Sequence, residues 1–119
     1  MEFGVFILAQ QRGYHQTSQQ VINNSIEQTV AAEQAGFNTA WYAEHHFNNY
    51  SLSPSPLMMV AHMAAKTKRI RLGTAVCILP LTTRRGFLRK WASSTRCPTA
   101  AWSWASARAT SSSSSNASA

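Results

Sequence analysis

Residues 1–81 alternate between short apolar runs and longer segments that mix apolar and polar positions. Phe3–Leu8 is a nearly continuous apolar run with aromatic and β-branched residues, which predicts a strand buried on both faces. Ser18 is a suitable N-cap for a helix that runs to about Ala35, and Gly36 stands where a left-handed C-terminal cap is wanted. Within that helix, apolar residues recur every fourth position and share one face: Ile22, Ile26 and Val30.

The same order then repeats along the chain. Phe37–Ala43 predicts a second strand, and Glu44–Ser55 predicts a long polar loop that ends in a serine suited to cap a helix. Leu57–Ala65 is apolar almost all round, so we expect a deeply packed helix. After a charged turn, Ile70–Leu79 predicts a third buried strand.

Strands and helices that alternate with short connections predict right-handed crossovers and a parallel sheet, so the fold class is α/β. An open doubly wound sheet and a (β/α)₈ barrel both fit this order. The first strand-to-helix connection, Ala9–Ser18, lacks GxGxxG, which counts against a dinucleotide site. Polar and aromatic residues gather after the first two strands, in Gln10–His15 and Glu44–Tyr50, where a barrel carries its chemistry.

The pattern stops after Pro80. Residues 82–119 contain no Ile, Val or Met, hold three of the four tryptophans and include the serine run Ser111–Ser115. Residues 1–81 carry five Lys or Arg and four Glu, whereas residues 82–119 carry six Lys or Arg and no acid. The basic balance therefore belongs to the tail, which is interpreted either as a disordered segment or as a basic module that binds nucleic acid.

Cysteine usage and the N-terminal residues indicate an ordinary soluble protein. Cys77 and Cys97 form neither a disulfide framework nor a zinc spacing. The run Phe3–Leu8 is too short to span a membrane, and no basic residue precedes it as in a signal peptide. We therefore expect a cytoplasmic protein without a membrane partner.

The loop after the second predicted strand holds the concentrated chemistry of the chain, in Glu44, His45 and His46. A histidine there can move protons near neutral pH, and an adjacent carboxylate can set its tautomer. Alternatively, these residues satisfy backbone groups at the strand end. A metal site that adds His62 is disfavoured, because adjacent histidines point in different directions and His62 fits a hydrogen-bonded core histidine. No metal is expected.

Three segments together resemble the luciferase-like flavin monooxygenases. They are FGVF at the start, AAEQAGFNTAWYAEHHF in the middle and RIRLGTAVCILPL at the third strand. They keep the order and approximate spacing of that family, and the resemblance covers residues 1–81. It implies that this segment is the first three βα units of a (β/α)₈ TIM barrel. The segment would then be a partial domain, because a complete barrel has about 250 residues.

The resemblance also implies a function and a set of site residues. The family uses reduced FMN and O₂ to oxygenate a small organic substrate, and some relatives use a deazaflavin instead. The first histidine of its EHH motif, implicated in catalysis, corresponds to His45. A non-proline cis peptide beneath the flavin ring corresponds to Ala75–Val76, which makes these residues flavin-facing candidates. The expected partners are a separate flavin reductase and further subunits of an oligomer, and not nucleic acid.

The tail departs from the family pattern, and a frame shift after about Leu81 would explain this departure. When the third base of each codon is read with the next two bases, Trp91–Ala92 and Trp104–Ala105 must each give glycine. A permitted path through the tail contains a helix, a turn and a Gly-rich strand in the family's order. Residues 82–119 are therefore expected to be an out-of-frame tail, and the chain itself a truncated form without monooxygenase activity.

Overall fold

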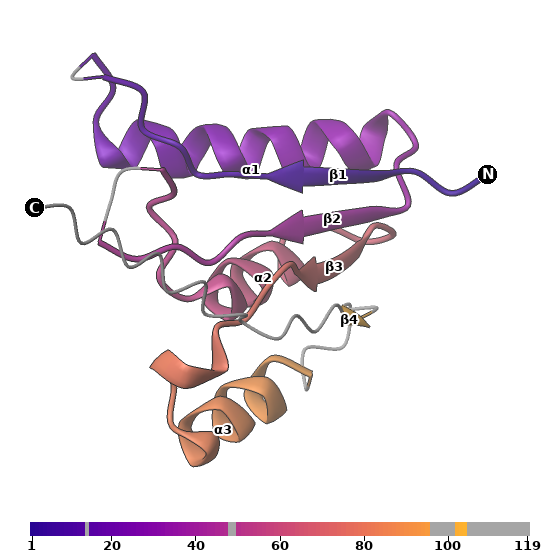
Figure 1. The fold of residues 1–119 in the computed structure, drawn as a ribbon. Helices are drawn as coiled ribbons and strands as arrows, with labels where there is room; N and C mark the ends of the chain where they lie inside the picture. Colours follow the sequence, from indigo (N-terminus) through magenta and orange to yellow (C-terminus); the bar gives the residue numbers. More distant parts are fainter. Residues whose placement is uncertain (14, 48–49, 96–101, 105–119) are drawn as a thin grey trace, which may run out of the picture.

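The computed structural model of the 119-residue chain describes residues 1–13, 15–47, 50–95 and 102–104. Its elements follow in the order β1 (Gly4–Ile7), α1 (Ser18–Gln34), β2 (Thr39–Tyr42), α2 (Pro56–Ala64), β3 (Arg71–Thr74), a 3₁₀ turn (Leu79–Leu81), α3 (Arg84–Thr95) and β4 (Trp102–Trp104). The four strands form one parallel sheet in the order β1-β2-β3-β4, as Figure 1 shows. The predicted alternation and the parallel sheet are confirmed.

The core lies between the sheet and the first two helices. Side chains of the strands that face the helices are Ile7, Ala40, Tyr42 and Leu72, and they pack with Val60, Met63 and Ala64 of α2 and Ala32 of α1. Because side chains alternate along a strand, the residues between them point to the opposite face. Phe6, Trp41 and Gly73 stand in one row across that second face, since they are partners in the strand register.

The expectation that the first strand is buried on both faces is wrong for the described chain. Phe6 is 52% exposed, whereas Ile7, its neighbour on the other face, is only 3% exposed. In the part of the chain that the structure describes, helices pack against the Ile7 face, whereas on the other face Phe6 is exposed, Trp41 is half-buried and Gly73 is buried. The apolar run therefore predicted a strand correctly, but it did not predict that one face of this strand is exposed.

The N-terminus of α1 is capped one residue earlier than the sequence indicated. Thr17 is the N-cap, and its hydroxyl accepts a hydrogen bond from the Gln20 backbone N–H at 3.2 Å. The Gln20 side chain accepts in turn from the Thr17 backbone N–H at 2.8 Å. This reciprocal capping box satisfies two of the free N–H groups of the first turn.

The buried face of α1 is centred on Val21, Ser25, Thr29 and Ala32, and the predicted Ile22, Ile26 and Val30 are half-buried beside it. Two hydroxyls can be buried there because Ser25 donates to the Val21 carbonyl and Thr29 to the Ser25 carbonyl, both at 2.9 Å. Since the Thr29 hydrogen is used in this way, the Tyr42 hydroxyl donates to Thr29 Oγ1 at 2.7 Å. Burial raises the pKa of Tyr42 to about 12, so this donor stays protonated at neutral pH.

Gly36 ends α1 with a left-handed backbone, as predicted, at φ +90°. A Cβ built at this position would have no atom within 4 Å, so a substitution would meet backbone strain and no steric clash. We expect Gly36→Ala to lower the free energy of unfolding by about 1–2 kcal/mol, measured by urea denaturation. Gly36→Asn is the matched control and should lose less, because asparagine tolerates this conformation; equal losses would contradict this account.

Glu33, in the last turn of α1, organises the charged turn before β3. Its Oε1 accepts hydrogen bonds from the backbone N–H groups of Lys68, Arg69 and Ile70 at 2.9, 2.6 and 2.9 Å. Burial acts to raise the pKa of Glu33, but these three hydrogen bonds and the Arg69 charge outweigh it and lower the pKa. The helix C-terminus and the start of β3 are thereby joined by one carboxylate.

A lowered folded-state pKa makes this stabilisation dependent on pH. It is present in full above the ordinary glutamate value of 4.5 and is lost as the pH falls through the lower folded-state value. We expect Glu33→Gln to cost about 1 kcal/mol at pH 7 and to flatten the fall in stability below pH 4.5. Urea denaturation across acidic pH measures this. Glu27→Gln, at an exposed position of the same helix, is the control; a fall as steep in E33Q as in the unaltered chain would refute the assignment.

Helix α2 is not packed on all sides, which corrects the prediction made from its composition. Val60, Met63 and Ala64 are buried against the sheet, whereas Met58 is 70% exposed and His62 is also exposed. His62 is therefore not a core histidine. The helix packs on β2 and β3 with one face, and in the described chain α3 covers only part of the rest. None of the described helices has the length and apolarity that a membrane-spanning helix needs.

The start of the tail continues the α/β order, contrary to the expectation of disorder. Arg84–Thr95 forms α3, which contacts α2, and Trp102–Trp104 pairs in parallel with β3. Thr83 begins the helix by accepting from the Gly86 backbone N–H at 3.1 Å. Phe87 and Trp91 are four residues apart and so share a face, a weak apolar signal that the arginines and serines obscured. The expectations for Cys97 and Ser111–Ser115 fall outside the described residues.

Candidate functional site

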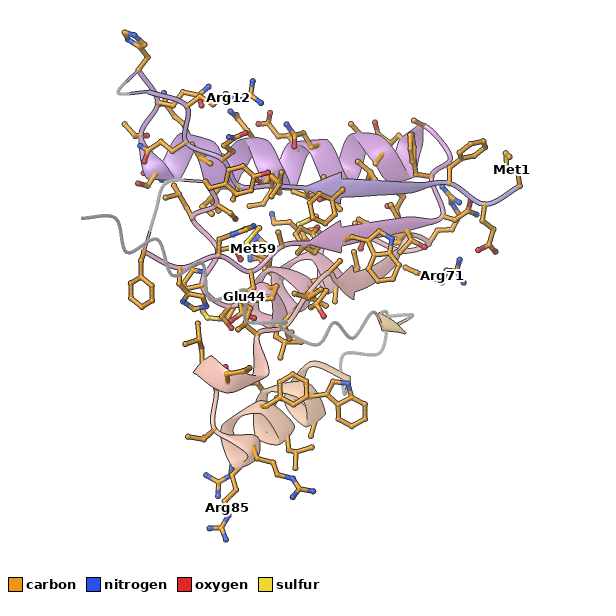
Figure 2. All side chains as sticks on the ribbon, in the orientation of Figure 1. Met1, Arg12, Glu44, Met59, Arg71 and Arg85 are labelled. Atoms are coloured by element: carbon orange, nitrogen blue, oxygen red, sulfur yellow. The ribbon has the colours of Figure 1, made fainter. Side chains whose placement is uncertain are left out.

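The segments that follow β1, β2 and β3 leave the sheet at the same end (Figure 1). Figure 2 shows Glu44 towards this end and Arg71, which is paired with Glu2, towards the opposite end. The loops at the carboxyl end are tied together by backbone hydrogen bonds, because Leu52 N–H donates to the Ala9 carbonyl at 2.8 Å. The polar loop predicted at Glu44–Ser55 therefore stands where a barrel places its active site.

Glu44 is a buried polar group at this end, and its carboxylate is fully paired. The residue is 6% exposed, and each carboxylate oxygen has its own partner. Oε1 lies 2.8 Å from His46 Nε2, and Oε2 accepts from the Ile78 backbone N–H at 2.8 Å. The carboxylate thus joins the loop after β2 to the segment after β3. The sequence placed a carboxylate beside a histidine correctly, although it could not tell which histidine.

His45 is half-buried and makes different contacts. Its backbone N–H donates to the Ser53 carbonyl at 3.2 Å, and its ring packs edge-on against Tyr50, with centroids 4.8 Å apart and planes at 78°. Adjacent residues leave the backbone in different directions, so only His46 reaches Glu44. Tyr50 was not singled out from the sequence, because its place beside the His45 ring depends on the path of the loop.

Ala75 and Val76 follow β3 directly, and both are half-buried. The peptide bond between them is cis, as the family resemblance implied. Ala75 N–H donates to the Tyr42 carbonyl at 2.9 Å, so the ladder between β2 and β3 continues to this point. By strand alternation Ala75 shares the side of Gly73, and together they present little side-chain bulk on the face opposite the helices.

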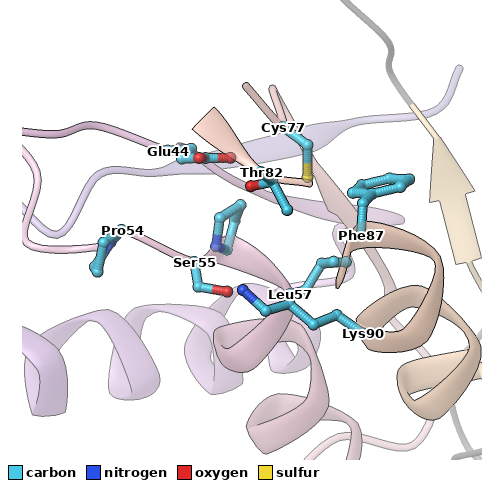
Figure 3. Close-up of a pocket in the computed structure, with 9 residues that line it drawn as sticks. Glu44, Pro54, Ser55, Leu57, Cys77, Thr82, Phe87 and Lys90 are labelled. Carbon is cyan, nitrogen blue, oxygen red and sulfur yellow. The ribbon is translucent and has the colours of Figure 1, made fainter. Parts of the chain in front are cut away.

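A small cavity lies beside Glu44 and is lined in part by residues of the tail, as Figure 3 shows. Its lining includes Cys77, Thr82, Phe87 and Lys90, and its volume of about 20 Å³ has room for about one water molecule. Burial raises the pKa of the Cys77 thiol, and the Glu44 charge adds to this, while a hydrogen bond with Thr74 and the Lys90 charge oppose it. The thiol is therefore protonated at neutral pH. Sequence analysis gave no role to Thr82, Phe87 and Lys90, because the tail lacked a recognisable pattern.

Two hydroxyls in the same loop are buried without a partner among the described residues, those of Ser51 and Ser53. Buried hydroxyls ordinarily find a partner, so the polar interior of this loop is incomplete within the described chain. No group of three His, Cys, Asp or Glu in this part of the chain is placed to hold a metal ion. In particular, the exposed His62 lies on α2 and not in the loop.

Comparison with known sequences matches this chain to a family profile and to individual relatives. The profile of the luciferase-like monooxygenase family matches residues 1–109. The uncharacterized protein y4vJ of Sinorhizobium fredii is 74% identical over 81 residues, which cover 68% of this chain and 23% of y4vJ. The oxygenase component of the flavin-dependent trigonelline monooxygenase of Acinetobacter baylyi is 34% identical over 80 residues, covering 67% of this chain and 22% of that protein.

The solved structures that resemble this chain are also monooxygenases. Monooxygenase RslO1 from Streptomyces bottropensis matches 92% of this chain with a TM-score of 0.79 and 27% identity, over 34% of its own length. The oxygenating constituent of 3,6-diketocamphane monooxygenase from Pseudomonas putida, in complex with FMN, matches 90% of this chain with a TM-score of 0.79 and 18% identity, over 29% of its length. These neighbours have the TIM-barrel fold, so the predicted fold class is confirmed for the N-terminal part that this chain represents.

The chain spans about a third or less of each of these relatives. The profile nevertheless covers most of its length, and the strand order, the loop at Glu44–His46 and the cis peptide at Ala75–Val76 occur in the order that the resemblance implied. The chain belongs to the luciferase-like monooxygenase family.

Proposed function

We propose that residues 1–81 supply one wall of the flavin site of a monooxygenase that uses reduced FMN and O₂ to oxygenate a small organic substrate. The observation that carries the proposal is the bridge made by Glu44, which reaches from the loop after β2 to Ile78 after β3. It holds the two candidate regions, His45 and Ala75–Val76, at the same end of a parallel sheet. Ligands of such sheets bind at that end.

The residues present fit a flat ring laid over the strand ends. Ala75 and Val76 are half-buried, and the small side chain of Ala75, near the buried Gly73, lets a planar group approach the backbone. The cavity beside Glu44, at about 20 Å³, is far too small to enclose such a ring. The described chain therefore supplies a surface for the ring, and the other walls would come from later strands of a complete barrel.

Reduced flavin would supply the electrons that activate O₂. The role proposed for His45 is to hold or move a proton at the site, because imidazole changes charge near neutral pH. Its edge-on contact with Tyr50 and its backbone bond to Ser53 fix the loop from which it acts. The Ala75–Val76 backbone would carry the ring.

Two relatives support the choice of cofactor and partner. The 3,6-diketocamphane monooxygenase structure contains FMN, and the trigonelline enzyme is named as an oxygenase component, which implies a second component. A separate reductase that delivers reduced flavin is therefore proposed here too, as is an oligomeric parent enzyme. Deazaflavin use is the alternative within the same fold.

We also propose that residues 82–119 are read out of frame, so that residue 81 is not a boundary between domains and the 119-residue chain has no monooxygenase activity. Support comes from the absence of acids and of Ile, Val and Met in this segment. The nucleotide sequence that encodes residues 79–119 tests this. An alternative frame with the family's Gly-rich strand is expected, and the lack of any such frame would contradict the proposal.

The flavin proposal is tested in a complete barrel. We would replace the matching segment of y4vJ with residues 1–81 of this chain and titrate the chimera with FMN and with a deazaflavin, following fluorescence. Saturable binding of FMN in preference to the deazaflavin is expected. Preference for the deazaflavin would favour the alternative, and a folded chimera that binds neither would contradict a flavin function for these residues.

A further inference from the structure

Glu44 makes two hydrogen bonds that constrain the proton on His46. An ionised carboxylate only accepts hydrogen bonds, and Oε2 is already paired with the Ile78 backbone N–H at 2.8 Å. Oε1 lies 2.8 Å from His46 Nε2, so this ring nitrogen must be the donor. In the neutral ring the proton therefore resides on Nε2, and Nδ1 is left as an acceptor.

The surroundings of Glu44 favour a fixed arrangement over a chance surface contact. The carboxylate side chain is 5% exposed, whereas the His46 side chain is 21% exposed, so the ring is held at its inner edge and is open at its outer edge. Phe47 follows with a positive φ of 61°, a left-handed backbone that residues other than glycine seldom adopt. A buried carboxylate with two donors is costly to disturb, because any unpaired partner loses its hydrogen bond.

The second bond of Glu44 reaches the other half of the candidate site. Ile78 lies two residues beyond the Ala75–Val76 peptide, and Oε2 holds its backbone N–H. The loop after β2 is tied in turn to the segment after β1 through Leu52 N–H and the Ala9 carbonyl. The Glu44 side chain therefore links the histidine loop to the segment after β3.

We propose that Glu44 is a positioning residue of this site, which fixes His46 with its proton on Nε2 and holds the segment that follows Ala75–Val76. It acts through its two partners and not by contact with substrate. The proposed consequence for catalysis rests on the proposed flavin function. The tautomer and the backbone bond do not, because they belong to the chain without any ligand.

Glu44→Gln separates the two bonds without a change in shape. The carboxamide has one acceptor oxygen and one donor group, so it cannot accept from both His46 and Ile78. Either the oxygen keeps Ile78 and the amide donates to His46 Nε2, which moves the neutral ring's proton to Nδ1, or the oxygen keeps His46 and Ile78 N–H loses its partner. If the His46 ring and the Ile78 backbone keep their places, one of these two changes must appear.

Nuclear magnetic resonance on the ¹⁵N- and ¹³C-labelled 119-residue chain measures both. With its imidazole neutral, the unaltered chain should show His46 with its proton on Nε2. E44Q should show either the Nδ1 tautomer or faster hydrogen exchange at the Ile78 amide. Glu27→Gln, at an exposed position of α1, should show neither. An unaltered chain with the proton on Nδ1 would overturn the proposal without the need for any variant, and so would an E44Q chain that differs in neither readout.

The catalytic consequence is measured in the y4vJ chimera. E44Q should lower kcat by about ten- to a hundredfold, the scale expected when a site is misplaced by a fraction of an ångström to 1 Å, with a smaller change in KM. Unchanged kcat in an E44Q chimera that binds flavin would overturn the positioning role and leave the flavin proposal standing. Absence of flavin binding in the chimera with Glu44 intact would contradict the flavin proposal, while the tautomer result would stand.

Discussion

Met63→Ala is expected to lower the free energy of unfolding by about 2–5 kcal/mol. Met63 is fully buried on α2, in the cluster that joins this helix to β2 and β3. Truncation removes the transfer free energy of the buried side chain and leaves a cavity that the surrounding strands can fill only in part. Urea denaturation followed by circular dichroism measures the change.

The same helix offers a matched control. Met58 is 70% exposed, so Met58→Ala makes the same chemical change with the same gain in helix propensity but removes little buried surface. We expect a change within about 0.5 kcal/mol. If M58A destabilised the chain as much as M63A, the orientation of α2 on the sheet would be wrong.

His45→Ala in the y4vJ chimera is expected to lower the rate of substrate oxygenation by about 10²–10⁴-fold, the usual contribution of a positioned acid or base. FMN affinity should change little, because the proposed ring support is the Ala75–Val76 backbone. The variant loses the ring contact with Tyr50 but keeps the backbone bonds from residue 45 to the Ser53 carbonyl and from Leu52 to the Ala9 carbonyl, so the loop should survive the loss of the imidazole. Single-turnover oxygenation with pre-reduced FMN measures the effect without dependence on a reductase.

His62→Ala is the control for that experiment. His62 is exposed on α2 and has no place in the loop after β2, so the variant should turn over like the parent chimera. A rate for H45A within about threefold of the parent would remove His45 from the chemistry, and equal losses in both variants would point to a general effect on folding.

The order of elements could be predicted from sequence because each signal was local. The Phe3–Leu8 run, the four-residue spacing in α1 and the left-handed Gly36 each specify their own element with little help from distant residues. A parallel arrangement then followed from the alternation of strands and helices. The order of elements in residues 1–81 and their parallel arrangement were therefore predictable from the sequence.

What the sequence could not provide depends on contacts between elements. The buried face of α1 passes through Ser25 and Thr29, whose hydroxyls are satisfied by the preceding turn and by Tyr42; a count of apolar residues could not find them. The exposure of Phe6 and Met58 reflects which neighbours are present, and not the residues themselves. The ordered start of the tail was missed because α3 carries only a weak apolar pattern among its arginines.

The same distinction applies to the site. The motif at Glu44–His46 located the chemistry, and the resemblance assigned His45 and the Ala75–Val76 peptide. The histidine that pairs with Glu44 is set by the direction in which each histidine leaves the loop, and Ile78 lies in the segment after the neighbouring strand. Such a bridge has no signature in a single sequence.

The most direct test of the central claim is a crystal structure of the y4vJ chimera with FMN bound. We expect the flavin ring to lie against the Ala75–Val76 backbone, on the side of the sheet away from α1 and α2, with the His45 imidazole facing the ring. A ring bound at another end or face of the sheet, or one that leaves His45 and Ala75–Val76 without contact, would contradict it.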